Sequence, residues 1–315
     1  MSETEIRKAG FCAIIGAPNA GKSTLTNQLV GAKVAIVTHK VQTTRFPVRG
    51  VAQIGDAQVV IVDTPGIFVA KRRLDRAMVK AAWGGADDAD CIIHLIDASA
   101  WVAEQTGRTS AAQRHSLEDD RRVISQLKEA GKRAILALNK IDLFPHDQVL
   151  PVMAALDAEG VYDEIFMISA EKGDGLERLE HAIAARMPEG PALYPPDQVA
   201  DLPMRLLAAE VTREKLMLRL HQELPYQLTV ETEAWEERAD GSVRIQQVVI
   251  VGRDGHKAMV LGKGGGLIKE IGRQARLELT EMLERPVHLF LFVKVDERWQ
   301  ERRETYRGIG LEFDV

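Results

Sequence analysis

The sequence predicts an α/β protein with two domains: a mostly parallel sheet with helices on both faces, followed by a smaller α+β domain. Over residues 1–187, short apolar runs alternate with helical patterns, which is typical of parallel sheets. Five prolines then fall within residues 188–203. After them the patterns follow the order helix, strand, strand, helix, helix, strand. A length of 315 residues agrees with this division.

The first domain is expected to span residues 1–187. Apolar runs predict buried strands at 11–15, 48–54, 58–62, 91–96, 133–138 and 164–168. Apolar periodicity predicts a helix through residue 127 and others at 23–30, 74–83, 149–158 and 176–187. Residues 38–49 lack a clean period and are interpreted as a mobile loop. Residues 101–118 are polar with little period, and we interpret them as a surface loop or an insertion.

The second domain is expected at residues 205–315, behind a proline-rich linker at 188–204. Periodicity predicts its helices at 205–222, 257–261 and 267–283. Apolar runs predict its strands at 227–235, 243–251 and 288–295. A glycine loop separates the last two helices, and a charged tail follows the last strand.

Composition limits the class of protein. A net charge of −5 excludes a polycation, so any nucleic-acid surface must be local. Cys12 and Cys91 lie in apolar runs and are expected to be small core residues rather than a disulfide or metal pair. Met1–Glu5 carries no apolar signal region, and the apolar runs are too short to span a bilayer. The expected location is the cytoplasm, a reducing compartment.

The residues after the first strand fit the pattern G-x-x-x-x-G-K-[ST], as Gly16-Ala17-Pro18-Asn19-Ala20-Gly21-Lys22-Ser23. A strand before it and a helix after it, which continues with Thr24, are the context in which this pattern cradles phosphates. Backbone N–H groups and the positive helix N-terminus face the phosphates, Lys22 reaches their outer oxygens, and the Ser23 hydroxyl can bind magnesium. A glycine-rich turn without a ligand is the alternative, against which the next motifs argue.

A second motif, Asp63-Thr64-Pro65-Gly66, closes a strand next to the cradle. An aspartate at this place holds magnesium through water. The N–H of Gly66 can meet a terminal phosphate oxygen and sense its loss. Alone, the pattern also fits an ordinary turn at a strand end, but after a cradle it indicates a nucleotide site.

A third motif, Asn139-Lys140-Ile141-Asp142, is expected to select the base. A carboxylate in the plane of a purine accepts from the ring N–H and the exocyclic amine of guanine. Asp142 would therefore reject adenine, which would leave buried polar groups unpaired. Asn139 would brace the loop, and the stem of Lys140 would lie along the ring. Backbone N–H groups of Ser169 and Ala170 would meet guanine O6.

With these motifs and the loop Gln42-Thr43-Thr44-Arg45, the whole chain resembles the Era family among the translation-factor-related GTPases. The resemblance implies a P-loop GTPase domain followed by a type II KH domain. It also implies GTP and GDP as ligands and slow hydrolysis of GTP to GDP and phosphate. Mg²⁺ would be held by Ser23, Asp63 and, in the GTP state, Thr44, with Thr43 as the weaker candidate.

Two positions bear on hydrolysis. Ile67 stands where Ras-like enzymes carry a glutamine that orients the attacking water. Because Ile67 has no donor or acceptor, no side-chain base is assigned, and Ile67→Ala is expected to change the rate by only a few-fold. Lys22, Gly66 and Asn19 are candidates to stabilise the transition state. In related GTPases an asparagine at the place of Asn19 helps hold a potassium ion; a local backbone bond is the alternative, and both stay open.

Residues 253–276 combine a G-x-x-G turn with positive charge. Six basic residues stand there against two acidic ones, a local charge of +4 in a chain of −5. Glycines let the backbone approach a sugar–phosphate chain, and the next helix N-terminus attracts phosphate. The alternative is a glycine-rich connection between helices with a solvated basic face. The residues expected to bind RNA are Lys257, Gly262, Lys263, Gly264, Gly265, Lys269, Arg273 and Arg276.

The resemblance implies binding of single-stranded ribosomal RNA at the 3′ end of 16S rRNA and a role in maturation of the small (30S) ribosomal subunit. We expect a cytoplasmic monomer. Some family members associate with membranes, so peripheral attachment to the inner face of the cell membrane is a further expectation. Two other functions stay open: an RNA-binding module whose nucleotide domain is structural, and a related GTPase that acts on another structured RNA.

Overall fold

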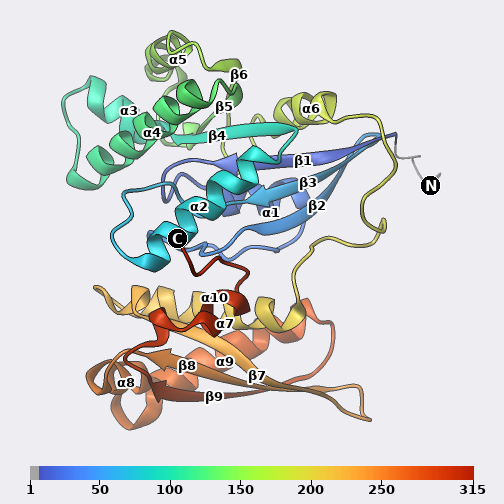
Figure 1. Cartoon of the computed structure of the whole chain (residues 1–315), viewed down its shortest axis with the longest axis vertical. Coiled ribbons are helices and arrows are strands. Elements are labelled where there is room, and N and C mark those ends of the chain that lie inside the picture. The colour runs from blue at the N-terminus through green and yellow to red at the C-terminus, as the bar shows by residue number, and fades with distance from the viewer. Residues whose placement is uncertain (1–6) are drawn as a thin grey trace. The chain divides into compact units, whose positions relative to one another are not determined.

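The computed structural model describes residues 7–315, so Met1–Glu5 and the prediction made for it lie outside the described residues. Contacts among the described residues divide the chain into two compact units (Figure 1). The first comprises residues 7–35, 44–201 and 315, and the second comprises residues 36–43 and 202–314. This division differs from the predicted domain bounds in three places: the loop 36–43, the linker and the last residue, Val315.

The first unit is built on a sheet with the strand order β2-β3-β1-β4-β5-β6. Its strands are β1 (Lys8–Ile15), β2 (Val48–Ile54), β3 (Ala57–Asp63), β4 (Cys91–Asp97), β5 (Ala134–Asn139) and β6 (Tyr162–Met167). Strand β2 runs antiparallel to β3, and the other neighbouring pairs are parallel, which confirms the predicted sheet. The register places Cys12 beside Cys91, and both are buried, as predicted for core residues.

Helices cover both faces of this sheet, as predicted (Figure 1). They are α1 (Lys22–Val30), α2 (Arg73–Asp87), α3 (Ala98–Gln105), α4 (Ala111–Ala130), α5 (Leu150–Asp157) and α6 (Leu176–Arg186). Apolar residues of α1 and α6, such as Leu25 and Leu179, share one buried cluster. Those of α2, α3, α4 and α5, such as Val123 and Val152, share a second cluster on the other face. The β5–α5 connection contains the short turns η1 (Ile141–Leu143) and η2 (His146–Gln148).

The prediction of an irregular loop at residues 101–118 is wrong, because most of these residues belong to α3 and α4. The apolar positions of α3 are mostly small, and α4 presents only alanine or polar residues until Leu117, so neither helix shows a strong period there. A start signal was present in the sequence. Ser110 Oγ accepts from the N–H of Gln113 (3.2 Å), and the Gln113 side chain accepts from the N–H of Ser110 (2.9 Å), which is a capping box.

The proline-rich linker lies along the first unit up to Asp201. The buried side chain of Gln58 accepts from the N–H groups of Leu193 (2.7 Å) and Tyr194 (2.9 Å). Further on, Ala200 forms a bridge with Gly50. The predicted linker 188–204 is therefore mostly an ordered part of the first unit, and the division between the units falls between residues 201 and 202.

The second unit confirms the predicted order of elements. It contains α7 (Met204–Arg219), η3 (Leu224–Tyr226), β7 (Leu228–Glu237), β8 (Val243–Val251), α8 (Asp254–Leu261), η4 (Lys263–Gly265), α9 (Gly266–Met282), β9 (Val287–Val295), η5 (Trp299–Glu301) and α10 (Arg303–Gly308). Strand β8 is central, antiparallel to β7 and parallel to β9. Residues of α7 and α9, among them Val211 and Ala275, pack together against the sheet. No helix within residues 7–315 combines the length and hydrophobicity needed to cross a membrane.

Candidate functional site

The predicted phosphate cradle joins β1 to α1 at the carboxyl end of β1. Gly16 (φ 148°) and Gly21 (φ 103°) adopt backbone conformations that favour glycine. A Cβ would lie 2.2 Å from the carbonyl oxygen of Leu95 at Gly16, and 2.3 Å from the side chain of Asn139 at Gly21. Both positions therefore need glycine, because the loop passes so close to the ends of the neighbouring strands.

Lys22 begins α1 and directs its ammonium group into the cradle. Its Nζ donates to the carbonyls of Gly16 (3.0 Å) and Ala17 (2.9 Å), and the side chain is buried. Burial lowers the pKa of Lys22 to about 8, and the nearby Asp63 carboxylate opposes that shift. The cradle thus contains a buried cation that phosphate oxygens can pair with. The next predicted residue, Thr24, is half-buried in the first turn of the helix.

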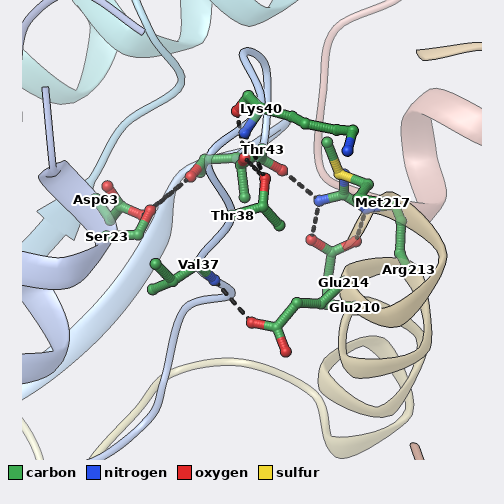
Figure 2. Close-up of polar contacts among 11 residues, drawn as sticks. Ser23, Val37, Thr38, Lys40, Thr43, Asp63, Glu210, Arg213, Glu214 and Met217 are labelled. Atoms are coloured by element: carbon green, nitrogen blue, oxygen red, sulfur yellow. Dashed lines mark hydrogen bonds and ion pairs between the residues drawn. The ribbon is translucent and has the colours of Figure 1, made fainter. Parts of the chain in front are cut away.

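The structure brings together Ser23, Thr44 and Asp63, the three predicted magnesium ligands. Ser23 Oγ donates to Asp63 Oδ2 at 2.7 Å (Figure 2). The Thr44 hydroxyl lies 2.8 Å from Ser23 Oγ and 3.2 Å from Asp63 Oδ2. The second carboxylate oxygen, Asp63 Oδ1, is buried and has no hydrogen-bond partner among the described residues. Burial raises the pKa of Asp63 to about 6, against the opposing effects of the Ser23 hydroxyl and Lys22.

These residues fit a magnesium ion. Two hydroxyls and a carboxylate are hard oxygen donors, and the unpaired Asp63 Oδ1 can accept from a water of the metal. Thr43 is directed elsewhere, because its Oγ1 donates to the carbonyl of Lys40 (2.8 Å) and lies 2.7 Å from Thr38 Oγ1. Thr44, and not Thr43, therefore lies at the predicted metal position.

The Asp63–Gly66 motif packs against the cradle. A Cβ on Gly66 would lie 2.8 Å from the ring of Pro18, so the two loops touch. Thr64 Oγ1 donates to the carbonyl of Ile14 at 2.7 Å, and Pro65 is buried. The N–H of Ile67 donates to the carbonyl of Gly16 at 3.1 Å, and its fully buried side chain belongs to the core beside α2. Ile67 therefore cannot contact an attacking water.

The Asn139–Asp142 motif is joined to the cradle by its first two side chains. Asn139 Nδ2 donates to the carbonyl of Ala20 at 2.8 Å. Lys140 has a left-handed backbone (φ 67°), and its Nζ donates to the carbonyl of Asn19 at 2.9 Å. Asp142 lies half-buried in η1, two residues after Lys140. The base-selecting motif and the phosphate cradle thus form one site.

The amides of Ser169 and Ala170, predicted to meet guanine O6, donate to other residues of the chain in this structure. The N–H of Ser169 donates to the carbonyl of Asp174 (3.0 Å), and the N–H of Ala170 donates to Asn139 Oδ1 (2.9 Å). In this arrangement both amides hold the loop rather than facing a base. Their partners could not be foreseen, because a local turn and a residue from another strand compete for the same donors.

Asp97 is a site residue that the sequence reasoning missed. It ends β4 in register with Asn139, and its Oδ2 lies 2.6 Å from Lys140 Nζ. Its Oδ1 accepts from the N–H of Ser99 (2.9 Å), which caps α3. The signal was available, since Asp97 directly follows an apolar strand whose carboxyl end faces the same site.

The predicted glycine loop joins α8 to α9 in the second unit. Gly262 (φ 69°), Gly264 (φ 59°) and Gly265 (φ 74°) all have positive φ values, which other residues adopt only at a cost. Lys263 and Gly264 are exposed. The loop therefore presents bare backbone and a lysine ahead of the N-terminus of α9, an arrangement that can receive a phosphate.

On the predicted basic surface, one of the positive charges is neutralised by an acidic neighbour. Lys269 and Arg276 are exposed and Lys257 is half-buried. Arg273 is also exposed, but its Nε and Nη2 donate to the carboxylate of Glu270 at 2.9 and 2.8 Å. These hydrogen bonds lower the pKa of Glu270 to about 2, so the pair stays ionised at neutral pH. The net charge near the glycine loop is therefore carried mainly by the lysines and Arg276.

Two family models match the chain. The model described as 50S ribosome-binding GTPase matches residues 11–140. The model described as KH domain matches residues 223–300. The first match contains the cradle, the Asp63–Gly66 motif and the start of the base-selecting motif, and the second contains the glycine loop.

The chain is also similar to named proteins over its full length. It is 57% identical over 316 residues to GTPase Era of Caulobacter vibrioides, with 100% of both chains covered. A crystal structure of a variant of Aquifex aeolicus Era bound to GDP·AlF4⁻ has a TM-score of 0.87 and 38% identity, covering 98% of this chain and 100% of that chain. A crystal structure of Era in complex with MgGDPNP and nucleotides 1506–1542 of 16S ribosomal RNA gives 0.87 and 37% at the same coverage.

Proposed function

Because this chain belongs to the Era family of GTPases, we propose that it is a GTP-hydrolysing switch that binds the 3′ end of 16S rRNA and assists assembly and maturation of the small ribosomal subunit. GTP and GDP are the ligands of the cradle. Single-stranded RNA is the ligand of the glycine loop. The two activities lie in the two units of one chain, and their coupling is part of the proposal.

The nucleotide half of the proposal rests on the side chain of Asn139. It donates to the carbonyl of Ala20 in the cradle and accepts from the N–H of Ala170, which supports Asp142, three residues further on, as part of the same site. Calorimetric titration with GTP, GDP and ATP in the presence of Mg²⁺ tests this half. Guanine nucleotides are expected to bind at least a hundredfold more tightly than ATP, because adenine lacks the donors that Asp142 accepts. Equal affinities would contradict it.

Mg²⁺ is the proposed cofactor, held by Ser23, Thr44 and Asp63, and the related complex with MgGDPNP supports it. When bound, the ion neutralises charge between the outer phosphates. Lys22 would pair with the same phosphates, and Gly66, which lies against Pro18 of the cradle, would donate its N–H to a γ-phosphate oxygen. Since Ile67 is buried, the attacking water is held by groups other than that side chain.

We further propose that Asn19 helps to hold a potassium ion at the cradle. Asn19 has a left-handed backbone (φ 63°), and its carbonyl accepts from Lys140. Its side chain would add an oxygen ligand for a monovalent cation near the transferring phosphate. Hydrolysis is compared in potassium and in sodium, in wild type and in Asn19→Ala. A potassium stimulation that disappears in the variant supports the ion, and equal rates in both salts favour a purely local role.

The RNA half rests on the glycine loop and its charge. Three positive-φ glycines expose the backbone beside Lys263, and Lys269 and Arg276 are exposed on the helix that follows. The related Era structure holds a fragment of 16S rRNA, which supports the same class of ligand here. Lys263→Ala and Lys269→Ala are each expected to weaken binding of every single strand and to reduce the salt dependence by about one phosphate contact.

The experiment for this half measures fluorescence anisotropy of a labelled oligonucleotide with the sequence of the 16S 3′ end. A shuffled oligonucleotide of the same composition is the control. Tighter binding of the authentic sequence supports the proposal, and equal binding of both would contradict the assigned target. Crosslinking in cells followed by sequencing then identifies the bound RNA and separates this function from that of a GTPase acting on another RNA.

We propose a monomer in the cytoplasm, with peripheral attachment to the inner face of the cell membrane. Sedimentation at micromolar concentration tests the oligomeric state. Cell fractionation tests the location, and release from the membrane fraction by high salt would support peripheral rather than integral attachment.

A further inference from the structure

The segment Ile36–Thr43, called the switch segment below, leaves the first unit and belongs by its contacts to the second. Both of its flanks are fixed in the first unit. Before it, the side chain of Asn27 accepts from the N–H of Ala35 (2.9 Å) and donates to the carbonyl of the same residue (2.8 Å). After it comes Thr44, at the predicted metal position. The chain therefore departs and returns at two defined points.

Helix α7 holds the switch segment near both of its ends (Figure 2). Near the start, the N–H of Val37 donates to Glu214 Oε1 at 2.8 Å. At the end, Arg213 Nη2 donates to the carbonyl of Thr43. Thr38 Oγ1 lies 2.7 Å from Thr43 Oγ1, which ties the two ends of the segment to each other. The segment is thus a closed turn with two anchors on one helix.

Arg213 is itself held rigidly. It is 1% exposed, and a buried guanidinium must have its donors satisfied. Its Nε donates to Glu210 Oε1 at 2.7 Å, its Nη2 donates to the other oxygen of Glu210, and its Nη1 lies 3.1 Å from Met217 Sδ. The guanidinium plane is fixed by these neighbours on the same helix. Its contact with Thr43 therefore has a defined direction.

The contact with Thr43 acts on Thr44 through the peptide bond. A peptide unit is planar, so fixing the carbonyl oxygen of Thr43 also fixes the direction of the N–H and Cα of Thr44. This restricts the backbone conformations open to Thr44, whose side chain reaches Ser23 and Asp63. A displaced Thr43 would turn the hydroxyl of Thr44 away from that position.

We infer that Arg213 and Glu214 are positioning residues of the GTP-bound site, which hold the switch segment so that the Thr44 hydroxyl reaches Mg²⁺. This inference rests on the proposed function, because it presupposes a magnesium nucleotide at the cradle. Ser23 and Asp63 can hold the metal with either nucleotide, whereas Thr44 would join only in the GTP state. The effect of the two positioning residues is therefore specific to that state.

The test uses the full chain and the double variant Glu210→Met/Arg213→Met. The double change removes the guanidinium without leaving a buried carboxylate unpaired. Calorimetry measures the Mg²⁺ concentration that gives half-maximal binding of GDPNP, and then of GDP. We expect this concentration to rise about tenfold with GDPNP and less than twofold with GDP. An unchanged value with GDPNP, or equal rises with both nucleotides, would overturn the inference.

A mutant cycle shows whether the effect passes through Thr44. Thr44→Val alone should give a similar rise with GDPNP, and adding the Glu210→Met/Arg213→Met change to it should add nothing. Additive effects would overturn the inference. Glu214→Gln keeps an acceptor for the N–H of Val37, so its Mg²⁺ requirement with GDPNP should stay near that of wild type. Glu214→Ala removes the acceptor and should raise that requirement.

Arg219→Met is the matched control, because it removes an exposed arginine from the same helix. Its Mg²⁺ requirement should equal that of wild type with both nucleotides. The inference and the proposed function fail in different ways. A wild-type chain that does not bind GDPNP with Mg²⁺ contradicts the proposed function. A wild-type chain that binds it, together with a double variant of equal Mg²⁺ requirement, contradicts the inference alone.

Discussion

Lys22 and Asp63 share one buried site, and their pKa values are displaced toward each other, to about 8 and about 6. Burial is the main cause for both, since it disfavours an ammonium and a carboxylate alike. The carboxylate of Asp63 partly offsets this effect by raising the pKa of Lys22, and the ammonium of Lys22 likewise lowers the pKa of Asp63. A bound phosphate that pairs with Lys22 therefore stabilises its charged form, and a metal ion that pairs with Asp63 does the same for the carboxylate.

Nucleotide binding is expected to take up a proton near pH 8. Half of the Lys22 side chains are neutral at that pH in the free protein, and bound phosphates raise the pKa, so about half a proton is taken up. At pH 7 about a tenth of the Lys22 side chains are neutral and about a tenth of the Asp63 side chains are protonated, so uptake at Lys22 and release at Asp63 on metal binding should nearly cancel. Calorimetry of GDP binding in two buffers of different ionisation enthalpy measures it. Heats that do not depend on the buffer at pH 8 would contradict this expectation.

Ile67→Val should leave GTP hydrolysis within about twofold of wild type, because the side chain is buried in the core and touches no ligand. The change should cost about 0.5–1.5 kcal/mol of stability. Alanine is the less informative substitution, since truncating a buried isoleucine costs about 2–5 kcal/mol and lowers the folded fraction. Single-turnover hydrolysis at saturating GTP checks the rate. A tenfold loss in a well-folded valine variant would show that Ile67 shapes the chemistry.

Asp142→Asn should shift the preference from guanosine to xanthosine nucleotides. The amide replaces one carboxylate acceptor by a donor, and xanthine carries a carbonyl where guanine carries an amine. We expect the affinity for GDP to fall about a hundredfold and that for XDP to exceed it. Competition binding measures both. Asp147→Asn, an exposed neighbour in η2, is the matched control and should keep the guanine preference. Retained preference in Asp142→Asn would remove that residue from base selection.

Asp97 has two functions that substitutions can separate. Asp97→Asn loses the ion pair with Lys140 but keeps an acceptor for the N–H of Ser99, whereas Asp97→Ala loses both. Each variant should bind GDP about fivefold more weakly, which corresponds to the net contribution of about one ordinary hydrogen bond. Only the alanine variant should lose a further amount of about 1 kcal/mol in the free energy of unfolding, from the missing helix cap. Equal stabilities would contradict the capping role.

Lys215 connects α7 to α9. It pairs with Glu214 (2.8 Å) and with Glu278, and α9 begins directly after the glycine loop. Burial alone would lower the pKa of Lys215, but the hydrogen bonds that it donates to the two glutamates raise that pKa, so the lysine stays charged. The coupling of nucleotide state to RNA binding is expected to use this connection. Lys215→Met should bring the ratio of RNA affinities with GDPNP and GDP from about tenfold toward one.

Anisotropy titrations with each nucleotide measure that ratio. Lys128→Met, which removes an exposed ion pair with Glu159, is the control and should keep the wild-type ratio. A ratio of one in the wild-type chain would show that no coupling exists. An undiminished ratio in Lys215→Met would show that coupling takes another route.

Most of the site could be predicted because each part of it is local in sequence. The cradle, the Asp63–Gly66 motif and the Asn139–Asp142 motif each follow an apolar strand, and parallel strands bring their carboxyl ends to one side of a sheet. The elements of the second unit could also be predicted, since its strands and helices each have a clear period. The sequence therefore indicated both the fold class and the main ligand.

The remainder depends on pairs that are distant in the sequence. The Arg213–Thr43 bond joins residues 170 positions apart, and no local pattern marks either as its partner. The charged stripe Glu210, Arg213 and Glu214 on an otherwise amphipathic helix was a possible signal, because charges that fall beside an apolar face need a partner if they are buried. The helix through residue 127 was predicted, but its first turns and the helix before it, within residues 98–118, were missed because the apolar positions there are mostly small or few.

The linker has a consequence for making fragments of this protein. Strand β2 is the outermost strand of its sheet, and the linker supplies hydrogen bonds on its open side, from the N–H of Val51 to Val199 and from the N–H of Asp201 to Arg49 (2.9 Å each). A GTPase fragment that stops at residue 187 would leave this edge unpaired and prone to aggregation. A fragment that continues to residue 201 keeps the linker residues that form hydrogen bonds with the open edge of β2.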